Sequence, residues 1–329
     1  MLSAGQWHNY SYNLILINYT GGITLTELKN VFLIGLGAIG GAFAGRIASN
    51  CPGSLKVVVD PERFERYKKS GITINGKKYD FDFVPAGYGD ETADLIIIAT
   101  KQHHLPEVIE DIRNLVGPRT IIMSLLNGIS SEEILGSEFG HEKMLHAFCV
   151  GTDAVRVGTD IKFGNIGSIV FGDKNGSSQS QKVKLVREFF ERAGVPYRVP
   201  DDIIREQWWK FMMNVGINQV SAVLRAPYKA FTVPGYARDL MLDASKEVIS
   251  IARKVGISLG EDGLKTYLEI LSNLSPDGKT SMLQDVEAGR KTEVEIFSGT
   301  VIRMGRQYGV RTPVNRMLYR LIKAIEEIS

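Results

Sequence analysis

Short, continuous apolar runs separated by helix-like segments dominate the first two thirds of the chain. Such runs lie within residues 31–34, 55–59, 94–99 and 120–126. Runs of this length are typical of parallel strands whose two faces are both buried. Their alternation with helical segments predicts an α/β domain with a Rossmann-type sheet, which we assign to residues 30–200.

The later part of this domain has a less regular pattern. Residues 151–172 are rich in Val, Ile, Thr and Gly and indicate strands joined by a turn, and residues 182–193 have the pattern of an amphipathic helix. Gly194 and Pro196 end that helix. A short strand is expected at 197–199, and the Pro-Asp-Asp sequence that follows marks the domain boundary.

Helical periodicity replaces the strand pattern after residue 200, so residues 201–329 are predicted to form an all-α domain. Two helices in it carry polar groups on otherwise apolar faces, at 206–218 and at 279–296. Residues 1–29 are interpreted as an N-terminal extension, with an added strand as one interpretation. Their apolar run, 14–17, is far shorter than the ~20 residues that span a bilayer.

Composition narrows the class of protein. The chain has 329 residues and a net charge of +2, so two soluble domains are expected, with neither nucleic acid nor a membrane as partner. Two cysteines, Cys51 and Cys149, indicate packing residues in a reducing compartment, and we expect a cytoplasmic protein. His103 and His104 have no further ligands at suitable spacing, so no metal site is predicted.

A glycine-rich motif follows the first predicted strand directly. Its residues are Gly35, Leu36, Gly37, Ala38, Ile39 and Gly40. Between a strand and a helix, this GxGxxG spacing predicts a site for the pyrophosphate of a dinucleotide at the helix N-terminus. The alternative is a glycine-rich turn without a ligand.

Polar residues follow the other strands. Asp60 ends the second strand, where an acid commonly accepts the ribose 2′-hydroxyl of NAD and repels the 2′-phosphate of NADP. Asp60 therefore favours NADH, although Arg63 is placed to bind a phosphate, and an Asp-Pro turn is the other interpretation. Lys101 and Asn127 follow later strands and are expected to face the cofactor, with a solvated lysine and an Asn-Gly turn as alternatives.

Lys210, Asn214 and Asn218 recur at every fourth position of an apolar helix, so they lie close to one stripe. On the later helix, Asp285, Gly289 and Glu293 have the same spacing. We expect the missing side chain of Gly289 to leave room for a ligand.

These residues resemble the ketopantoate reductase (2-dehydropantoate 2-reductase) family. The likeness covers about residue 30 to the C-terminus and includes the stretches GLGAIG, TKQ and LNG. Its more specific part is Trp209, Lys210, Asn214 and Asn218, with SMLQDV from Ser281 and RKTEVEIFSG from Arg290.

The resemblance implies a Rossmann domain followed by a helical domain like the C-terminal domain of 6-phosphogluconate dehydrogenase. It implies reduction of ketopantoate with NADPH, with Lys210 as the general acid and Glu293 binding the substrate hydroxyl. It assigns the remaining substrate contacts to Asn214, Asn218, Ser281 and Asn127, and cofactor contacts to Lys101 and Asn127. Asp60 departs from the arginine that family members often carry there, which puts the NADPH preference in doubt.

The chemistry fits these roles, because a positioned proton donor stabilises the charge that develops on a reduced keto oxygen. Apolar Trp and Met neighbours are expected to lower the pKa of Lys210, and Asn214 to orient its ammonium. Ser281 as a helix cap, through Ser281-x-x-Gln284, is the structural alternative. Three functional alternatives stay open: a reductase of another 2-keto acid, a 3-hydroxy acid or opine dehydrogenase, and a non-catalytic NAD(P) sensor. A homodimer also stays open.

Overall fold

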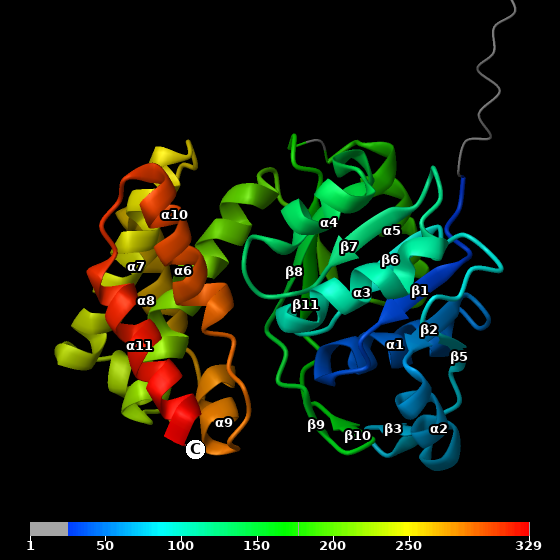
Figure 1. Cartoon of the computed structure of the whole chain (residues 1–329), viewed down its shortest axis with the longest axis horizontal. Coiled ribbons are helices and arrows are strands. Elements are labelled where there is room, and N and C mark those ends of the chain that lie inside the picture. The colour runs from blue at the N-terminus through cyan, green and yellow to red at the C-terminus, as the bar shows by residue number, and fades with distance from the viewer. Residues whose placement is uncertain (1–25, 177, 329) are drawn as a thin grey trace, which may run out of the picture.

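The computed structural model describes residues 26–176 and 178–328, so the extension predicted at residues 1–29 lies almost wholly outside the described residues. An eight-stranded sheet forms the centre of the N-terminal half (Figure 1). In spatial order its strands are β12 (Tyr197–Arg198), β11 (Ser168–Gly172), β8 (Met144–Val150), β7 (Ile121–Ser124), β6 (Leu95–Ile98), β1 (Val31–Ile34), β2 (Leu55–Val59) and β5 (Asp82–Pro85). β8 and β11 run antiparallel and the other neighbours are parallel.

Helices cover both faces of this sheet. They are α1 (Ala38–Asn50) and α5 (Gln181–Ala193) on one face, and α3 (Leu105–Ile112) and α4 (Ser131–Phe139) on the other. Along β1, Val31 and Leu33 belong to the core under α1 and α5, whereas Phe32 and Ile34 belong to the core under α3 and α4. Because side chains alternate along a strand, a continuous apolar run supplies both cores.

A second, four-stranded sheet lies beside the glycine-rich end of α1. It consists of β4 (Lys77–Tyr79), β3 (Ile72–Ile74), β10 (Asp160–Lys162) and β9 (Val155–Val157), and α2 (Pro61–Ser70) precedes it in the chain. The strands predicted within 151–172 are present, but they divide between the two sheets. β9 and β10 form a hairpin in the small sheet and β11 joins the large one.

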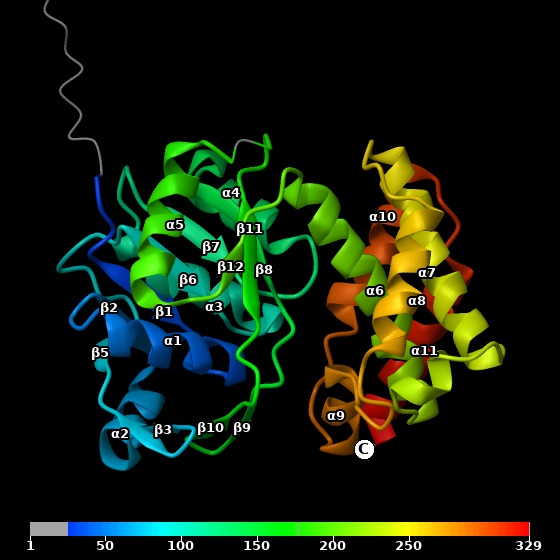
Figure 2. The same ribbon diagram turned by 180° about the vertical axis from the view of Figure 1, so that it is seen from behind.

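The C-terminal half is helical and lies to one side of the sheet (Figure 2). Its helices are α6 (Ile203–Leu224), α7 (Tyr236–Lys254), α8 (Glu261–Ser272), α9 (Ser281–Glu287), α10 (Thr300–Tyr308) and α11 (Pro313–Ile328), with a π-helical segment at Glu295–Gly299. Short 3-10 turns occur in the chain at Gln102–His104, Arg113–Leu115, His141–Lys143 and Tyr228–Phe231. α6 begins at the predicted domain boundary, where Asp202 accepts a hydrogen bond from the Arg205 amide at 2.9 Å.

The helix predicted at 279–296 is wrong in its length, because α9 ends at Glu287. Gly289 has φ +62°, its amide donates to the Val286 carbonyl at 3.2 Å, and the Arg290 amide donates to the Asp285 carbonyl at 2.8 Å. This pair of bonds is the Schellman motif that ends many helices at a glycine. Asp285, Gly289 and Glu293 therefore do not share one helical face.

The predicted fold class, a Rossmann-like α/β sheet followed by a helical C-terminal region, is confirmed. Within the described ranges, no helix combines the length and apolar character needed to cross a bilayer.

Two motif glycines are expected to respond differently to an added methyl group. A Cβ on Gly40 would lie 2.0 Å from the Gly35 carbonyl oxygen, whereas a Cβ on Gly37 would meet only the Ala99 oxygen, at 3.8 Å. Gly40→Ala should lower the free energy of unfolding by about 1–3 kcal/mol. Gly37→Ala should change it by no more than about 0.5 kcal/mol. Urea denaturation checks both, and equal stabilities of the two variants would contradict the packing argument.

Candidate active site

The glycine-rich motif forms a cradle at the carboxyl end of β1, where the strand order of the sheet reverses between β1 and β6. Gly35 has φ +100°, and a Cβ there would lie 2.6 Å from the Ala99 oxygen, so only glycine fits. Gly37 is the N-cap of α1 and caps it with no side chain, which leaves amide groups of the first turn for a ligand. Ala38, Ile39 and Gly40 begin the helix itself.

Two polar atoms beside this cradle are buried without a partner among the described residues. They are the Thr100 Oγ1 and Gln102 Oε1 atoms, just after β6. The Gln102 amide nitrogen is already bound to Ser130 Oγ at 3.0 Å. Buried polar atoms are normally paired, so unpaired ones beside a glycine cradle fit the presence of a polar ligand. The residues present therefore fit a dinucleotide.

Asp60 is engaged locally. Its Oδ1 accepts the Arg63 amide at 2.8 Å, which caps α2, and its Oδ2 lies 3.1 Å from Arg63 Nη1. Asp60 is thus the N-cap of α2, with Pro61 at the first helical position, and the Asp-Pro pair begins a helix. The end of β2 thus presents a carboxylate paired with a guanidinium, and the predicted repulsion of a 2′-phosphate is weaker than that of a lone carboxylate.

Three side chains join the two halves of the molecule in one hydrogen-bonded chain. Lys210, on α6, donates from Nζ to Asn127 Oδ1 at 3.0 Å. Asn127, which follows β7, donates from Nδ2 to Glu293 Oε2 at 3.1 Å. Next to Asn127, a Cβ on Gly128 would lie 2.4 Å from Ile296 Cγ2, so this glycine permits the π-helical segment to approach the end of β7.

The two ends of this hydrogen-bonded chain are an amine, on Lys210, and a carboxyl, on Glu293. Burial lowers the pKa of the Lys210 ammonium below its ordinary value, although the charge of Glu293 acts in the opposite direction. Burial raises the pKa of the Glu293 carboxyl, against the hydrogen bond from Asn127. The ammonium also lies 5.3 Å from the centre of the Phe148 ring. An amine and a carboxyl with pKa values shifted toward neutrality are typical of groups that exchange protons or bind reacting atoms.

The lowered pKa of Lys210 is as expected, but one expectation about this residue is wrong in detail. The amide that holds its ammonium is Asn127, not Asn214. Helical side chains lean toward the helix N-terminus, so the long lysine reaches away from the residue one turn later. The Phe148 ring of β8 is a further aromatic neighbour, from outside α6.

Lys101 binds the helical half. Its Nζ donates to Asp285 Oδ2 at 2.9 Å and to the Lys291 carbonyl at 3.4 Å. Asp285 is 7% exposed and also accepts from Arg290 Nε at 2.9 Å. Lys101 is therefore part of a second contact between the halves, and it is not the freely solvated lysine of the alternative interpretation.

The remaining predicted substrate residues are not hydrogen-bonded into this chain within the described residues. Asn214 and Asn218 lie one and two turns beyond Lys210 on α6, and Asn218 is buried. Ser281 is exposed at the start of α9. Its predicted capping role is wrong, because Thr280 Oγ1 accepts the Leu283 amide at 3.2 Å and is the N-cap. The Ser281 hydroxyl is thus not committed to the helix.

A buried polar network holds the start of α6, and the sequence pattern did not predict it. Glu132 Oε1 accepts from Gln207 Nε2 at 2.7 Å, and Gln207 Oε1 lies 3.0 Å from His146 Nδ1. Glu132 and Gln207 are 2% and 3% exposed, and Ser131 Oγ donates to Glu132 at 3.0 Å. A glutamine one turn before Lys210 on an apolar helix was the available signal.

Neither cysteine is paired. Cys149 is buried on β8, and burial raises the pKa of its thiol to about 12, so it stays protonated. In the part of the chain that the structure describes, three or more His, Cys, Asp or Glu side chains do not gather at any point where they could hold a metal ion.

A Rossmann-like sheet with a glycine cradle, joined to a helical half across its strand ends, is typical of oxidoreductases that use a nicotinamide cofactor. The family model described as ketopantoate reductase PanE/ApbA matches residues 31–176. The model of the C-terminal part of the same family matches residues 202–326. The chain belongs to the ketopantoate reductase family, and the resemblance noted in the sequence is confirmed.

Individual relatives are distant. The 2-dehydropantoate 2-reductase of Aquifex aeolicus is 25% identical over 310 residues, which cover 89% of this chain and 96% of the relative. A D-mandelate dehydrogenase solved with NADH and anilino(oxo)acetate has a TM-score of 0.81 at 23% identity, covering 91% and 99% of the two chains. A dimeric ketopantoate reductase from Staphylococcus aureus has a TM-score of 0.77 at 21% identity, covering 91% and 99%. At these identities the two solved structures show the shared fold.

Removing the charge of Asp285 should lower the pKa of Glu293. Asp285 raises that pKa by like-charge repulsion and Lys101 lowers it, so Asp285→Asn removes the first influence and keeps the second. A carbon-13 NMR titration of the glutamate carboxyl groups, assigned with Glu293→Gln, measures the shift. Glu287→Gln is the matched control, because Glu287 is an exposed acid on α9, the helix that carries Asp285. A Glu293 pKa that stays the same or rises in Asp285→Asn would contradict this electrostatic description.

Proposed function

We propose that the protein is a 2-dehydropantoate 2-reductase that uses NAD(P)H. The observation that carries the proposal is the chain from Lys210 through Asn127 to Glu293, with N–O distances of 3.0 and 3.1 Å, between the two halves of the molecule. It offers one proton donor and one acceptor beside a fold that fits a dinucleotide. Membership of the family supports the same reaction.

When bound at the glycine cradle, a nicotinamide would supply the hydride for the keto carbon. Lys210 donates a proton to the keto oxygen as negative charge develops there, a contribution of about 10²–10⁴-fold for a positioned acid. The Asn127 carbonyl keeps the ammonium in place without neutralising it as a carboxylate would. The depressed pKa of Lys210 makes it a stronger acid than an exposed lysine.

Glu293 accepts a hydrogen bond from the hydroxyl of 2-dehydropantoate. A buried carboxylate that is left unpaired is costly, so a site built to bind a hydroxyl rejects analogues that lack it. Asn214 and Asn218, on the same helix as Lys210, and Ser281 complete the substrate contacts in this proposal. Each has a side chain without a hydrogen-bonded partner among the described residues, which supports a role toward a ligand.

The dinucleotide is held by the cradle from Gly35 to Gly40 and by groups at the strand ends. Asp60 would accept from the adenine ribose, Asn127 would bind the nicotinamide side, and Lys101 would lie at the cofactor. We infer a preference for NADH, because the Asp60 carboxylate disfavours a 2′-phosphate. Arg63, 3.1 Å from that carboxylate, makes the preference a moderate one.

We also propose that residues 30–200 and 201–329 act as cofactor and substrate domains, with the substrate bound between them. The separate apolar cores of the two halves support this division. A homodimer is the proposed assembly, supported by the dimeric relative from Staphylococcus aureus.

A second function is reduction of an aromatic 2-keto acid. The similarity to a D-mandelate dehydrogenase solved with NADH supports it, as does Asp60. Such a substrate carries no hydroxyl for Glu293, which favours 2-dehydropantoate. The opine and 3-hydroxy acid alternatives and the non-catalytic sensor have no comparable observation in their favour.

Loss of the ammonium should remove turnover and spare cofactor binding. Lys210→Met is expected to lower kcat at least about 100-fold, since the proton donor is gone, and to keep the Kd for NADH within about twofold. Following NADH and NADPH absorbance separately with 2-dehydropantoate and with phenylglyoxylate measures activity, cofactor choice and substrate together. Lys229→Met, which removes an exposed lysine, is the control. Wild-type protein that oxidises neither cofactor with either keto acid would overturn the proposal.

The pH dependence of kcat/KM should be bell-shaped. Lys210 acts protonated, so activity should fall as pH rises through its pKa, which lies below the ordinary 10.5. Glu293 acts ionised, so activity should fall as pH drops through its pKa, which lies above the ordinary 4.5. Glu293→Gln should weaken substrate binding and remove the acidic limb. A profile that is flat on the acidic side in the wild-type enzyme would refute the role of Glu293.

A further inference from the structure

The hairpin of β9 and β10 carries an arginine to the cofactor cradle from outside it. Arg156, in the middle of β9, donates from Nη1 to the carbonyl oxygen of Leu36, inside the glycine-rich motif. Its Nη2 donates to Tyr67 Oη at 2.9 Å, and its Nε donates to the Gly158 carbonyl at 2.8 Å. The guanidinium also lies 5.3 Å from the centre of the Tyr67 ring. Three neighbouring residues thus fix this side chain, and Tyr67 contacts it through both its hydroxyl and its ring.

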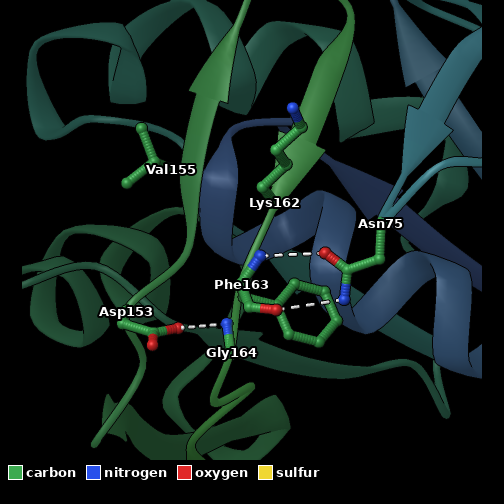
Figure 3. A pocket seen from close by; sticks show the side chains of 6 residues that line it. All are labelled: Asn75, Asp153, Val155, Lys162, Phe163 and Gly164. Carbon is green, nitrogen blue, oxygen red and sulfur yellow. Dashed lines mark hydrogen bonds between the residues drawn. The ribbon is translucent and has the colours of Figure 1, made fainter.

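The small sheet is firmly placed against α1. Ile161 of β10 is fully buried, and a Cβ on Gly41 would lie 2.1 Å from its Cδ1 atom. The hollow drawn in Figure 3 has a volume of about 500 Å³ and lies at the open end of the hairpin, opposite its turn. There Asn75 accepts the Phe163 amide at 2.9 Å and donates to the Phe163 carbonyl at 3.1 Å. These bonds tie the residue that follows β10 to the residue that follows β3, so hydrogen bonds as well as packing hold the hairpin in place.

The bond to Leu36 fixes one peptide group of the cradle. In a trans peptide the C=O of one residue and the N–H of the next point in opposite directions. Holding the Leu36 carbonyl toward the hairpin therefore turns the Gly37 N–H away from the hairpin. Among the described residues no carboxylate forms an ion pair with Arg156, so its positive charge next to the cradle is uncompensated.

We propose that Arg156 is a positioning residue for the dinucleotide: it orients the Leu36–Gly37 peptide toward the pyrophosphate and adds positive charge beside it. This rests on the proposed function only in requiring that the chain binds a dinucleotide. Arg156 does not reach the reacting atoms in this proposal, so its contribution belongs to cofactor affinity and not to the chemical step.

The test compares Arg156→Met, Arg156→Lys and the matched control Lys162→Met. Lys162 lies on the same hairpin, is 74% exposed and pairs only with Asp160 among the described residues, so its loss removes the same charge without touching the cradle. Isothermal titration gives Kd for NADH, NADPH and ADP-ribose, and steady-state assays give kcat and KM. Thermal unfolding verifies that each variant is folded.

Arg156→Met should raise the Kd for all three nucleotides about 10- to 100-fold, the usual effect of losing a hydrogen bond from a charged group. Its kcat at saturating cofactor should stay within about twofold of wild type. Arg156→Lys should restore part of the affinity, because it keeps the positive charge but lacks the planar set of donors of the guanidinium. Lys162→Met should bind like the wild type. A folded Arg156→Met with wild-type Kd, or an equal loss in Lys162→Met, would overturn the proposal.

Two further outcomes are decisive. If Arg156→Met does not fold, Tyr67→Phe and Arg156→Lys carry the test, and wild-type Kd values in both would overturn it. Binding is measured without a keto acid, so a wild-type protein that binds NADH and reduces no keto acid refutes the reductase proposal alone. A wild-type protein that binds none of the three nucleotides refutes both.

Discussion

The contact of Asn127 with both Lys210 and Glu293 is the constraint on which the arrangement of the molecule depends. Asn127 can meet them only because β7 ends in a central position of the sheet and α6 and the π-helical segment both approach that end. An amide is suited to this place, since it accepts from the ammonium on one side and donates to the carboxylate on the other. A single neutral side chain thereby holds two opposite charges near one another while leaving hydrogen-bonding capacity on both for a substrate.

The backbone around Glu293 serves the same contact. The chain leaves α9 through the Schellman turn at Gly289 and enters a π-helical segment at Glu295, two residues after Glu293. The Glu293 carbonyl accepts from the Ile296 amide at 3.0 Å. π-Helical segments often occur at functional sites, where the extra residue in a turn redirects a side chain. A straight continuation of α9 would have kept Glu293 in line with Asp285.

The sequence predicted the fold well where one pattern had one structural meaning. The apolar runs gave the central strands because both faces of each are buried, and the glycine spacing gave the strand–turn–helix at Gly35. It failed where tertiary contacts decide, as for the separate small sheet and the partner of Lys210. It also missed a local feature, the Schellman turn at Gly289 that ends α9. Spacing along α6 placed Asn214 near the lysine in projection, but the direction of the side chain and the position of Asn127 depend on packing between distant segments. Arg156 and Glu132 carried no recognisable local motif.

The network around Gln207 has a mechanical consequence. Because Glu132 and His146 bind Gln207 in the interior, hydrogen bonds attach the first turns of α6 to the N-terminal half. A hinge at the start of α6 is therefore excluded for any motion that keeps these bonds. An opening of the interface that keeps these bonds would instead separate the two halves at the other edge, where Lys101 meets Asp285, and would bend α6 further along or the loops that flank α9.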